Sequence, residues 1–442
     1  MLVGIDASRA FIKNRTGVEE YSYQAIKHLA CRQAGLRDKL NDAQVVLYLR
    51  KNQAVNFELP KNWKIKIIKI PYLWTQIGLS LELLFHPVDT LFVPAHTVPF
   101  IHPARNATLF NVALYIQIIL KFFGVNTYYN MHGVAGGPKN TIVTIHGLEY
   151  EIFPRGYSFW ARMYMRWSIK NSCQWAKTII AVSNNTKNDL IKLYGINKDK
   201  IKVIYEGYNS NFKFQISNFK SNPNEQISKP YLLFIGRIEI RKNIDGILDA
   251  YKILVEKYNV PYTLVLAGTP GHGYEIIKLK IENYLKIKNL KLKIIEAGFV
   301  SEEEKWELLK NADVFLFPTF YEGFGIPILE AQSVGCPVVA GDNSSVREII
   351  TIPPSPQTRR GLGRGDDANE QHLPFSSHPQ LRRGGLESAL LVDPKNAEQI
   401  ADAAYKLISD KNLRDDIIKK GYENVKRFSW KKCASEIAGL FV

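Results

Sequence analysis

Two glutamates separated by a glycine-containing loop have the spacing of a site for sugar hydroxyls and phosphate. Glu322 and Glu330 stand eight positions apart, and Gly323 and Gly325 follow the first of them. The apolar run 312–318 before them predicts a buried strand, and a proline shortly before the second glutamate suits a first helical turn. Glycines at a helix start let backbone amides approach an anion, while carboxylates accept hydrogen bonds from hydroxyls. The pattern predicts a nucleotide-sugar pocket at the carboxyl end of a strand.

A second group of residues brings cations to a strand end about eighty positions earlier. The strand predicted at 232–235 turns at Gly236 and delivers Arg237 and Lys242 close together. A departing nucleoside diphosphate carries about two negative charges, which a divalent metal or fixed cations can stabilise. The sequence has no Asp-x-Asp in a loop after a strand and no His/Cys cluster. We therefore expect cations rather than a metal, and no cofactor.

Together these two groups of residues resemble the signature of glycosyltransferase family 4, the retaining group 1 enzymes of the GT-B fold, in a mannosyltransferase-like subgroup. The resemblance implies that Arg237 and Lys242 grip the donor diphosphate. It also implies that Glu322 binds the sugar hydroxyls and Glu330 the ribose hydroxyls. The donor-binding residues expected here are Gly236, Arg237, Lys242, Glu322, Gly323, Phe324, Gly325 and Glu330.

The resemblance extends to fainter signals elsewhere in the chain. Gly17, at a predicted helix start, matches a glycine that lets the backbone approach the donor phosphate, although a plain turn is the alternative. His146 ends a predicted strand and matches a histidine that helps to position the reacting centre. With Glu322, Arg237 and Lys242 it completes the expected catalytic set. Phe299 and Val300 resemble the turn that binds the nucleobase. His96, at another strand end, is a candidate for the acceptor side.

Composition and charge restrict the class of protein. A chain of 442 residues, 46% hydrophobic and 23% charged, suits two globular domains. Four cysteines without paired spacing and an N-terminus without a signal-peptide pattern favour a reducing, cytoplasmic location. The formal net charge of +16 allows peripheral contact with the inner face of the cell membrane, or reflects a lysine-rich composition alone. No nucleic-acid-binding motif is present, so a nucleic-acid partner is not expected.

Strand and helix patterns alternate through both halves of the chain, which predicts an α/β fold with parallel sheets. The strands are predicted near 2–5, 45–47, 65–70, 90–93, 142–145, 179–182, 202–204, 232–235, 264–267, 294–296, 314–317, 338–339 and 390–392. By resemblance this is the GT-B fold, two Rossmann-like domains facing across a cleft. The expected division is an acceptor-side domain at 1–208, a linker at 209–230, a donor domain at 231–428 and a C-terminal helix at 429–442 that returns to the first domain.

Two segments interrupt this plan. Residues 104–137 include a long apolar run, for which we weigh a surface insertion, an interfacial membrane helix and, least, a transmembrane helix. Residues 351–388 are rich in Pro, Gly, Arg and Ser, unlike the rest of the chain, and predict a disordered surface insertion.

The function expected from the sequence is a retaining, metal-independent transfer of a hexose to a glycan or lipid-linked glycan in surface polysaccharide synthesis. GDP-mannose is the first expected donor and a UDP-sugar the second. Two alternatives remain open at this point. One is a nucleotide-sugar epimerase of the same fold, and the other is a non-catalytic nucleotide-sugar-binding or membrane-scaffold protein disabled by its insertions. A dinucleotide oxidoreductase is disfavoured because no Gly-x-Gly-x-x-Gly follows the first strand.

Overall fold

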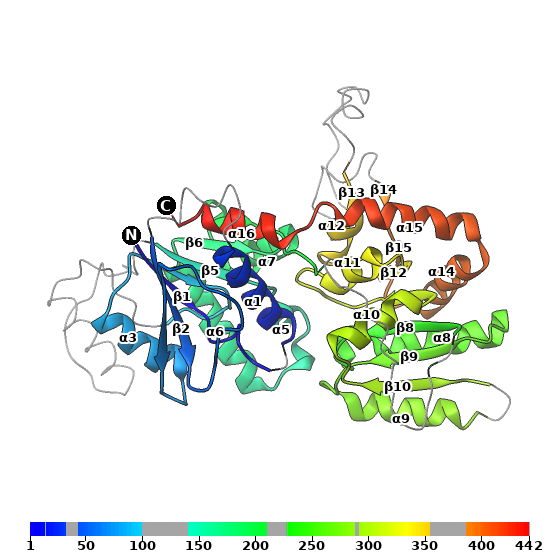
Figure 1. Cartoon of the computed structure of the whole chain (residues 1–442). Helices are drawn as coiled ribbons and strands as arrows, with labels where there is room; N and C mark the ends of the chain where they lie inside the picture. Colours follow the sequence, from blue (N-terminus) through cyan, green and yellow to red (C-terminus); the bar gives the residue numbers. More distant parts are fainter. Residues whose placement is uncertain are drawn as a thin grey trace, which may run out of the picture. The chain divides into compact units, whose positions relative to one another are not determined.

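The structure, a computed structural model, describes most of the chain. It covers residues 1–13, 15–31, 43–99, 140–209, 227, 229–287, 291–353 and 386–441. The predicted insertion at 104–137 and nearly all of the predicted linker at 209–230 lie outside these residues. The chain separates into two compact units, one made of Met1–Gly207 with Ser429–Val442 and the other of Tyr208–Phe428 (Figure 1).

The first unit is built on a parallel sheet, seven strands of which lie in the described residues. Its strands are β1 (Leu2–Asp6), β2 (Gln44–Arg50), β3 (Trp63–Ile68), β4 (Thr90–Val93), β5 (Thr141–Ile145), β6 (Thr178–Ala181) and β7 (Ile201–Val203). Their order is β3-β2-β1-β4-β5-β6-β7. The central strands β4 and β5 are buried along their whole length, as expected when helices cover both faces of a parallel sheet.

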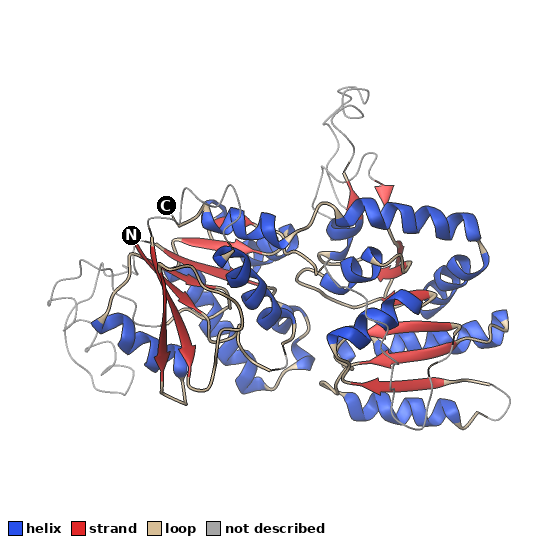
Figure 2. Ribbon diagram, in the orientation of Figure 1, coloured by secondary structure: helices blue, strands red, loops and turns tan. Residues whose placement is uncertain are grey.

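Helices pack against both faces of this sheet (Figure 2). They are α1 (Gly17–Ala30), the π-helix η1 (Trp74–Leu79), α3 (Ser80–Phe85), α5 (Glu149–Ile152), α6 (Phe159–Trp175), α7 (Asn184–Tyr194) and α16 (Trp430–Ala438), with short 3-10 turns η2 (Pro154–Gly156) and η3 (Lys198–Lys200). The last helix, α16, lies against α1, where the rings of Tyr21 and Trp430 are 5.9 Å apart. The end of the chain therefore belongs to the first unit although the second unit precedes it in sequence.

The second unit repeats the architecture with a parallel sheet in the order β10-β9-β8-β11-β12-β15. Its strands are β8 (Tyr231–Ile235), β9 (Thr263–Ala267), β10 (Ile294–Gly298), β11 (Val314–Phe317), β12 (Val338–Gly341) and β15 (Leu390–Val392). Its helices are η4 (Ile240–Lys242), α8 (Ile244–Tyr258), α9 (Tyr274–Leu285), α10 (Glu302–Asn311), α11 (Ile326–Ser333), α12 (Val346–Ile350), α14 (Ala397–Ser409) and α15 (Lys411–Val425). All thirteen predicted strands are present, so the two Rossmann-like sheets predicted from periodicity are confirmed.

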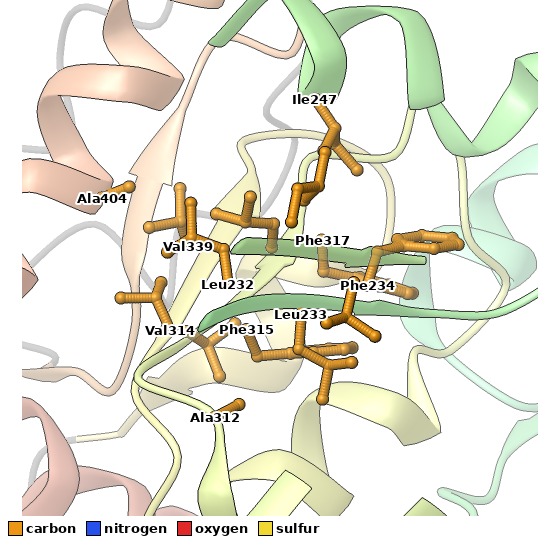
Figure 3. Close-up of a cluster of buried hydrophobic side chains, with 14 of the residues drawn as sticks. Leu232, Leu233, Phe234, Ile247, Ala312, Val314, Phe315, Phe317, Val339 and Ala404 are labelled. Carbon is orange, nitrogen blue, oxygen red and sulfur yellow. The ribbon is translucent and has the colours of Figure 1, made fainter. Parts of the chain in front are cut away.

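Large apolar side chains from neighbouring strands fill the core of the second unit (Figure 3). Phe234 on β8 and Phe317 on β11 stack with ring centroids 6.5 Å apart, and Phe315 stacks on Phe317. All three side chains are fully buried. This packing holds β8 and β11 side by side, so the two loops that leave their carboxyl ends are adjacent as well.

Two glycines allow a close approach of backbone at the carboxyl ends of β8 and β9. Gly268 has a φ of +150°, and a Cβ built there would lie 1.8 Å from the carbonyl oxygen of Gly236. Only glycine avoids this collision, because it carries no Cβ. The turn that carries Arg237 therefore passes directly over the end of β9.

The predicted disorder of 351–388 is wrong at both ends of that segment. Thr351–Ile352 forms β13 and pairs antiparallel with Leu386–Glu387, which forms β14. The backbone N–H of Ser388 donates to the carbonyl of Ile350 at 3.1 Å, and its buried hydroxyl donates to the same oxygen at 2.7 Å. The composition of a segment says nothing about pairing between its two ends. The prediction therefore missed these strands, which lie more than thirty residues apart. The interior of the segment, 354–385, lies outside the described residues.

Candidate functional site

The loops after β8 and β11 meet at a buried ion pair. Lys242, in the 3-10 turn η4 after β8, places its Nζ 2.6 Å from Oε1 of Glu322, in the loop after β11. Arg241 approaches the same carboxylate oxygen at 3.7 Å and also pairs with Glu239 at 2.8 Å. Because β8 and β11 are hydrogen-bonded neighbours, residues eighty positions apart in sequence become partners at one sheet edge.

Backbone and amide contacts fix the relative position of these two loops. The carbonyl of Arg241 accepts from the N–H of Phe320 at 3.1 Å, and its guanidinium donates to the carbonyl of Tyr321 at 2.9 Å. Asn243, which caps α8 in the left-handed conformation, donates from Nδ2 to the carbonyl of Pro318 at 2.9 Å. The cationic loop is thus attached to the glutamate loop at several points. Such attachment keeps charged groups in place before a ligand arrives.

Ser345 sets the direction of the peptide groups in the glycine loop. Its fully buried hydroxyl lies 2.9 Å from the carbonyl oxygen of Glu322 and 2.8 Å from that of Phe324, so that its single hydrogen is shared between the two acceptors. In a trans peptide the C=O and the following N–H point in opposite directions. The N–H groups of Gly323 and Gly325 therefore both point away from Ser345. Ser345 thus sets the orientation of both peptide groups.

The second glutamate of the motif lies in α11 and is also paired. Glu330 is buried, and its Oε1 lies 2.7 Å from Nζ of Lys305 on α10. Lys305 also approaches Glu302 at 2.9 Å. This cation holds one oxygen of the Glu330 carboxylate and thereby sets its orientation.

The pKa values of the two largely buried lysines of the site shift in opposite directions. Burial lowers the pKa of Lys242, with the charge of Arg241 beside it, and outweighs the opposing effect of Glu322. Burial also acts to lower the pKa of Lys305, but the carboxylates of Glu330 and Glu302 together outweigh it and raise that pKa. The carboxylates of Glu330 and Glu302 thus favour the charged form of Lys305, whereas Lys242 shares the Glu322 carboxylate with Arg241.

Apart from Gly17, which is in the first unit, the remaining residues predicted for the donor follow strands β8 and β10 of the second unit. Arg237 is exposed immediately after Gly236, at the end of β8. Phe299 is exposed directly after β10, while Val300 packs against the core. The structure therefore brings Lys242 and Glu322 into contact, whereas no described hydrogen bond or ion pair joins Arg237 to that pair.

His146 belongs to the first unit, at the end of β5, and is held on both sides of its ring. Nδ1 lies 3.1 Å from Oε1 of Glu206, and Nε2 lies 2.9 Å from the carbonyl oxygen of Pro94. The ring of Tyr21 packs edge-on against it at 4.5 Å. Carboxylate and carbonyl oxygens both accept, so both contacts are hydrogen bonds only when each ring nitrogen carries a hydrogen.

His96 and Gly17 flank this histidine in different ways. The backbone N–H of His146 donates to Nδ1 of His96 at 3.4 Å, and the two rings are 5.2 Å apart and perpendicular. Burial lowers the pKa of His96 to about 3, with repulsion from His146 and Arg9 adding to the effect. Gly17 begins α1, as predicted, and nothing lies within 4 Å of a Cβ built on it.

Four residues that complete these clusters were not predicted from the sequence: Arg241, Lys305, Glu206 and Ser345. Arg241 was adjacent to a predicted site residue, and its charge was the only available signal. Lys305 stands in a helix that begins with the capping box of Ser301 and Glu304 and reads as an ordinary charged surface helix. Nothing in the local sequence of Glu206 or Ser345 indicated their partners. Within the described residues, no cluster of three or more His, Cys, Asp or Glu side chains could bind a metal ion.

Comparison with protein families identifies the class. Residues 215–352 match the family described as Glycosyl transferases group 1, and residues 89–212 match Glycosyltransferase Family 4. The first match contains the ion pair of Lys242 and Glu322 and the Glu330 helix. The second contains His146 and His96.

Curated relatives are named as glycosyltransferases or mannosyltransferases. The chain is 26% identical to the O-antigen chain mannosyltransferase B of Escherichia coli, over 69% of this chain and 70% of that protein. It is 27% identical to an uncharacterized glycosyltransferase of Methanocaldococcus jannaschii, over 62% of this chain and 61% of that protein. It is 25% identical to the O-antigen chain mannosyltransferase RfbU of Salmonella typhimurium, over 54% of this chain and 62% of that protein. The alignments thus span about two thirds of these relatives' lengths.

Solved structures show the same fold. A sucrose-phosphate synthase from Thermosynechococcus elongatus superposes with a TM-score of 0.62 at 16% identity, covering 100% of this chain and 98% of that one. The glycosyltransferase WaaG, involved in lipopolysaccharide biosynthesis, superposes with a TM-score of 0.60 at 13% identity, covering 100% of both chains. Anabaena HepE in complex with UDP and glucose gives a TM-score of 0.58 at 16% identity, covering 99% of this chain and 98% of that one.

The two Rossmann-like units have the GT-B fold of these glycosyltransferases. The chain belongs to the group 1 glycosyltransferases of family 4, with mannosyltransferase-like relatives, and is a hexosyltransferase. The family and fold predicted from the sequence are confirmed.

Proposed function

We propose that the protein transfers mannose from GDP-mannose to a glycan or lipid-linked glycan acceptor during surface polysaccharide synthesis, with retention at the anomeric carbon and without a metal. A UDP-sugar is the second candidate donor. Two O-antigen mannosyltransferases among the relatives support mannose, whereas a fold neighbour in complex with UDP and glucose keeps the UDP-sugar open.

The observation that carries the proposal is the contact of Lys242 with Glu322 beside Arg241. A donor diphosphate supplies Lys242 with a new anionic partner. Glu322 is then available to accept hydrogen bonds from the sugar hydroxyls. Arg237 and the amides of Gly323 and Gly325 add positive charge around the leaving group, which is where negative charge develops in the transition state.

Glu330 completes the donor site in this proposal. Lys305 holds Oε1 of its carboxylate, and a carboxylate oriented in this way can accept hydrogen bonds from the ribose hydroxyls. Phe299 and Val300 follow β10 on the same sheet edge and would address the base. His146 and Gly17, in the first unit, are proposed to act on the sugar and the phosphate respectively.

The reaction we propose needs no protein base. The acceptor hydroxyl oxygen attacks the anomeric carbon on the face that the diphosphate leaves, and the bond from that carbon to the phosphate oxygen breaks. The hydroxyl proton passes to the departing diphosphate oxygen. The products are the glycoside with the donor's anomeric configuration and a nucleoside diphosphate.

The test measures release of nucleoside diphosphate from GDP-mannose, UDP-glucose, UDP-N-acetylglucosamine and ADP-glucose, with and without EDTA, and with and without a membrane lipid extract. We expect release from GDP-mannose that the extract stimulates and EDTA leaves unchanged. Loss of activity in EDTA that added Mg²⁺ restores would overturn metal independence. Binding of a donor without release from any donor would indicate a non-catalytic protein. A product of opposite anomeric configuration, read by nuclear magnetic resonance, would overturn retention.

A further inference from the structure

Helix α6 of the first unit exposes a row of large apolar side chains. These are Phe159, Trp160, Met163, Tyr164 and Trp167, and their spacing of one, three or four residues places them along one side of the helix. Trp160 is 80% exposed and Phe159 is 64% exposed, and their rings pack edge-on at 5.4 Å. Soluble proteins seldom leave such a group of aromatic side chains in water unless the surface binds something.

The polar residues of α6 carry only one sign of charge. Arg162, Arg166 and Lys170 recur every four residues, and the helix contains no Asp or Glu. Arg166 pairs with Glu151 of the neighbouring helix α5 and remains partly exposed. Lys170 is exposed one turn beyond the aromatic row. The helix therefore combines an aromatic surface with an excess of positive charge.

A second exposed apolar row lies over the same face of the sheet. Leu73, Ile77, Leu81 and Phe85 recur every four residues along η1 and α3, and Phe85 is 73% exposed. The segments that carry the two rows both form hydrogen bonds with Val98, in the loop after β4. Gln76 of η1 donates to the carbonyl of Val98, while the N–H of Val98 donates to the hydroxyl of Ser172 on α6. Within the described residues, no helix is long and apolar enough to cross a membrane.

We propose that the exposed side of α6 binds the interfacial region of an anionic lipid bilayer. Trp and Tyr rings are favoured at the level of the lipid headgroups, where their apolar body and polar edge are both accommodated. Cations beside the rings attract anionic headgroups, and an apolar row on an amphipathic helix enters the headgroup boundary. A convex helix side suits a flat, deformable surface. A glycan that stacks on the aromatic rings is the competing occupant, and Met163 and the aliphatic row of η1 and α3 favour lipid over it.

This surface belongs to the first unit and the donor-site residues of the β8 and β11 loops to the second, and binding to vesicles requires no glycosyl transfer. The two proposals can therefore fail independently. The direct test is co-sedimentation of the full chain with large unilamellar vesicles of phosphatidylglycerol and phosphatidylcholine, compared with phosphatidylcholine alone. Tryptophan emission is recorded in parallel, because entry of Trp160 into the headgroup region shifts it to shorter wavelength.

The double variant Phe159→Ser/Trp160→Ser should reduce partition into the anionic vesicles at least about tenfold, because each removed ring loses apolar area buried in lipid. The matched control is Ile276→Ser/Leu279→Ser on α9, which removes two apolar side chains of similar exposure from the second unit. We expect it to bind vesicles as the unaltered chain does. Lys170→Glu should weaken binding to the anionic vesicles and leave binding to phosphatidylcholine unchanged.

Each contrary outcome overturns the proposal. The unaltered chain could fail to sediment with anionic vesicles, or the double variant could bind as well as the control. Tryptophan emission that shifts on addition of mannose oligosaccharides, with no shift on addition of vesicles, would assign the surface to a glycan instead. Thermal unfolding of each variant is the control for folding. Because the altered side chains are exposed, we expect each melting temperature to stay close to that of the unaltered chain.

Discussion

Nζ of Lys242 lies 2.6 Å from Oε1 of Glu322, although eighty residues separate the two in the chain. Both side chains are nearly buried, and Arg241 shares the same carboxylate. The two charged groups that we propose to bind the diphosphate and the sugar thus contact each other directly. The relationship suggests an exchange of partners when the donor binds.

A double-mutant cycle on this pair should separate stability from function. Lys242→Met leaves Glu322 without its closest cation and should lower the free energy of unfolding by roughly 3 kcal/mol. Adding Glu322→Gln removes the orphaned charge and should recover about 1–3 kcal/mol of that loss. Turnover should stay low in both variants. Chemical denaturation and nucleoside diphosphate release measure the two effects, and full additivity of the stability changes would contradict the pairing.

Arg237→Ala tests the expected cation of the diphosphate site. The side chain is exposed, so the melting temperature should change little. Loss of one electrostatic contact to the leaving group should lower kcat on the order of 10²–10³-fold. Lys278→Ala, which removes an exposed cation of α9, is the control and should retain full turnover. Near-normal turnover in folded Arg237→Ala protein would remove Arg237 from the site.

Lys305→Met tests whether this lysine positions Glu330. The substitution leaves the buried carboxylate without its cation, so both its orientation and its hydrogen bonds to a ribose should suffer. We expect binding of GDP, measured by calorimetry, to weaken about tenfold or more. Lys310→Met, exposed at the far end of the same helix, should bind GDP normally. If Lys305→Met raised KM for the donor but left GDP binding intact, the ribose role of Glu330 would be wrong.

Gly17→Ala distinguishes a glycine required for ligand approach from a plain helix start. Nothing in the structure lies within 4 Å of the added methyl group, so the fold should tolerate it. Alanine also favours the helical state over glycine by up to about 1 kcal/mol. Donor turnover should nevertheless fall if the backbone of Gly17 contacts phosphate. Gly268→Ala provides the contrast. Its added Cβ would lie 1.8 Å from the carbonyl oxygen of Gly236, so we expect this substitution to unfold the second unit.

His96 should make the free energy of unfolding fall as the pH is lowered. The folded state holds the pKa of His96 near 3, below its ordinary value of 6.5, so the folded protein binds fewer protons than the unfolded chain in that interval. The contribution of His96 to the free energy of unfolding is therefore fully present above pH 6.5 and is lost as the pH falls below that value. Between pH 6.5 and about pH 5 the loss is at most about 2 kcal/mol.

The measurement is denaturation by urea across this pH interval. His96→Gln should reduce the acid loss of unfolding free energy, because glutamine does not titrate. His86→Gln, whose ring is 67% exposed in the same unit, should follow the unaltered protein. Parallel pH curves for His96→Gln and the unaltered chain would show that the pKa of His96 is the same in the folded and unfolded states, which would contradict the prediction.

The sequence by itself determined the fold and the approximate location of the site. Strand periodicity is local, so thirteen strands could be assigned without knowledge of their neighbours. The glycine, proline and glutamate pattern of 321–330 predicted the strand, loop and helix that the structure contains. The residues of this motif could be recognised because binding of a sugar and a phosphate restricts both the residue types and their spacing.

Only the tertiary structure decided which side chains meet. The parallel pairing of β8 with β11 sets Lys242 against Glu322, and the packing of α10 beside α11 sets Lys305 against Glu330. The antiparallel pairing at 351–352 and 386–387 was likewise concealed by its low-complexity neighbourhood. These contacts depend on sheet order and register over long sequence separations. Periodicity carries no information about register between strands, because every register of a buried parallel strand preserves the same apolar pattern.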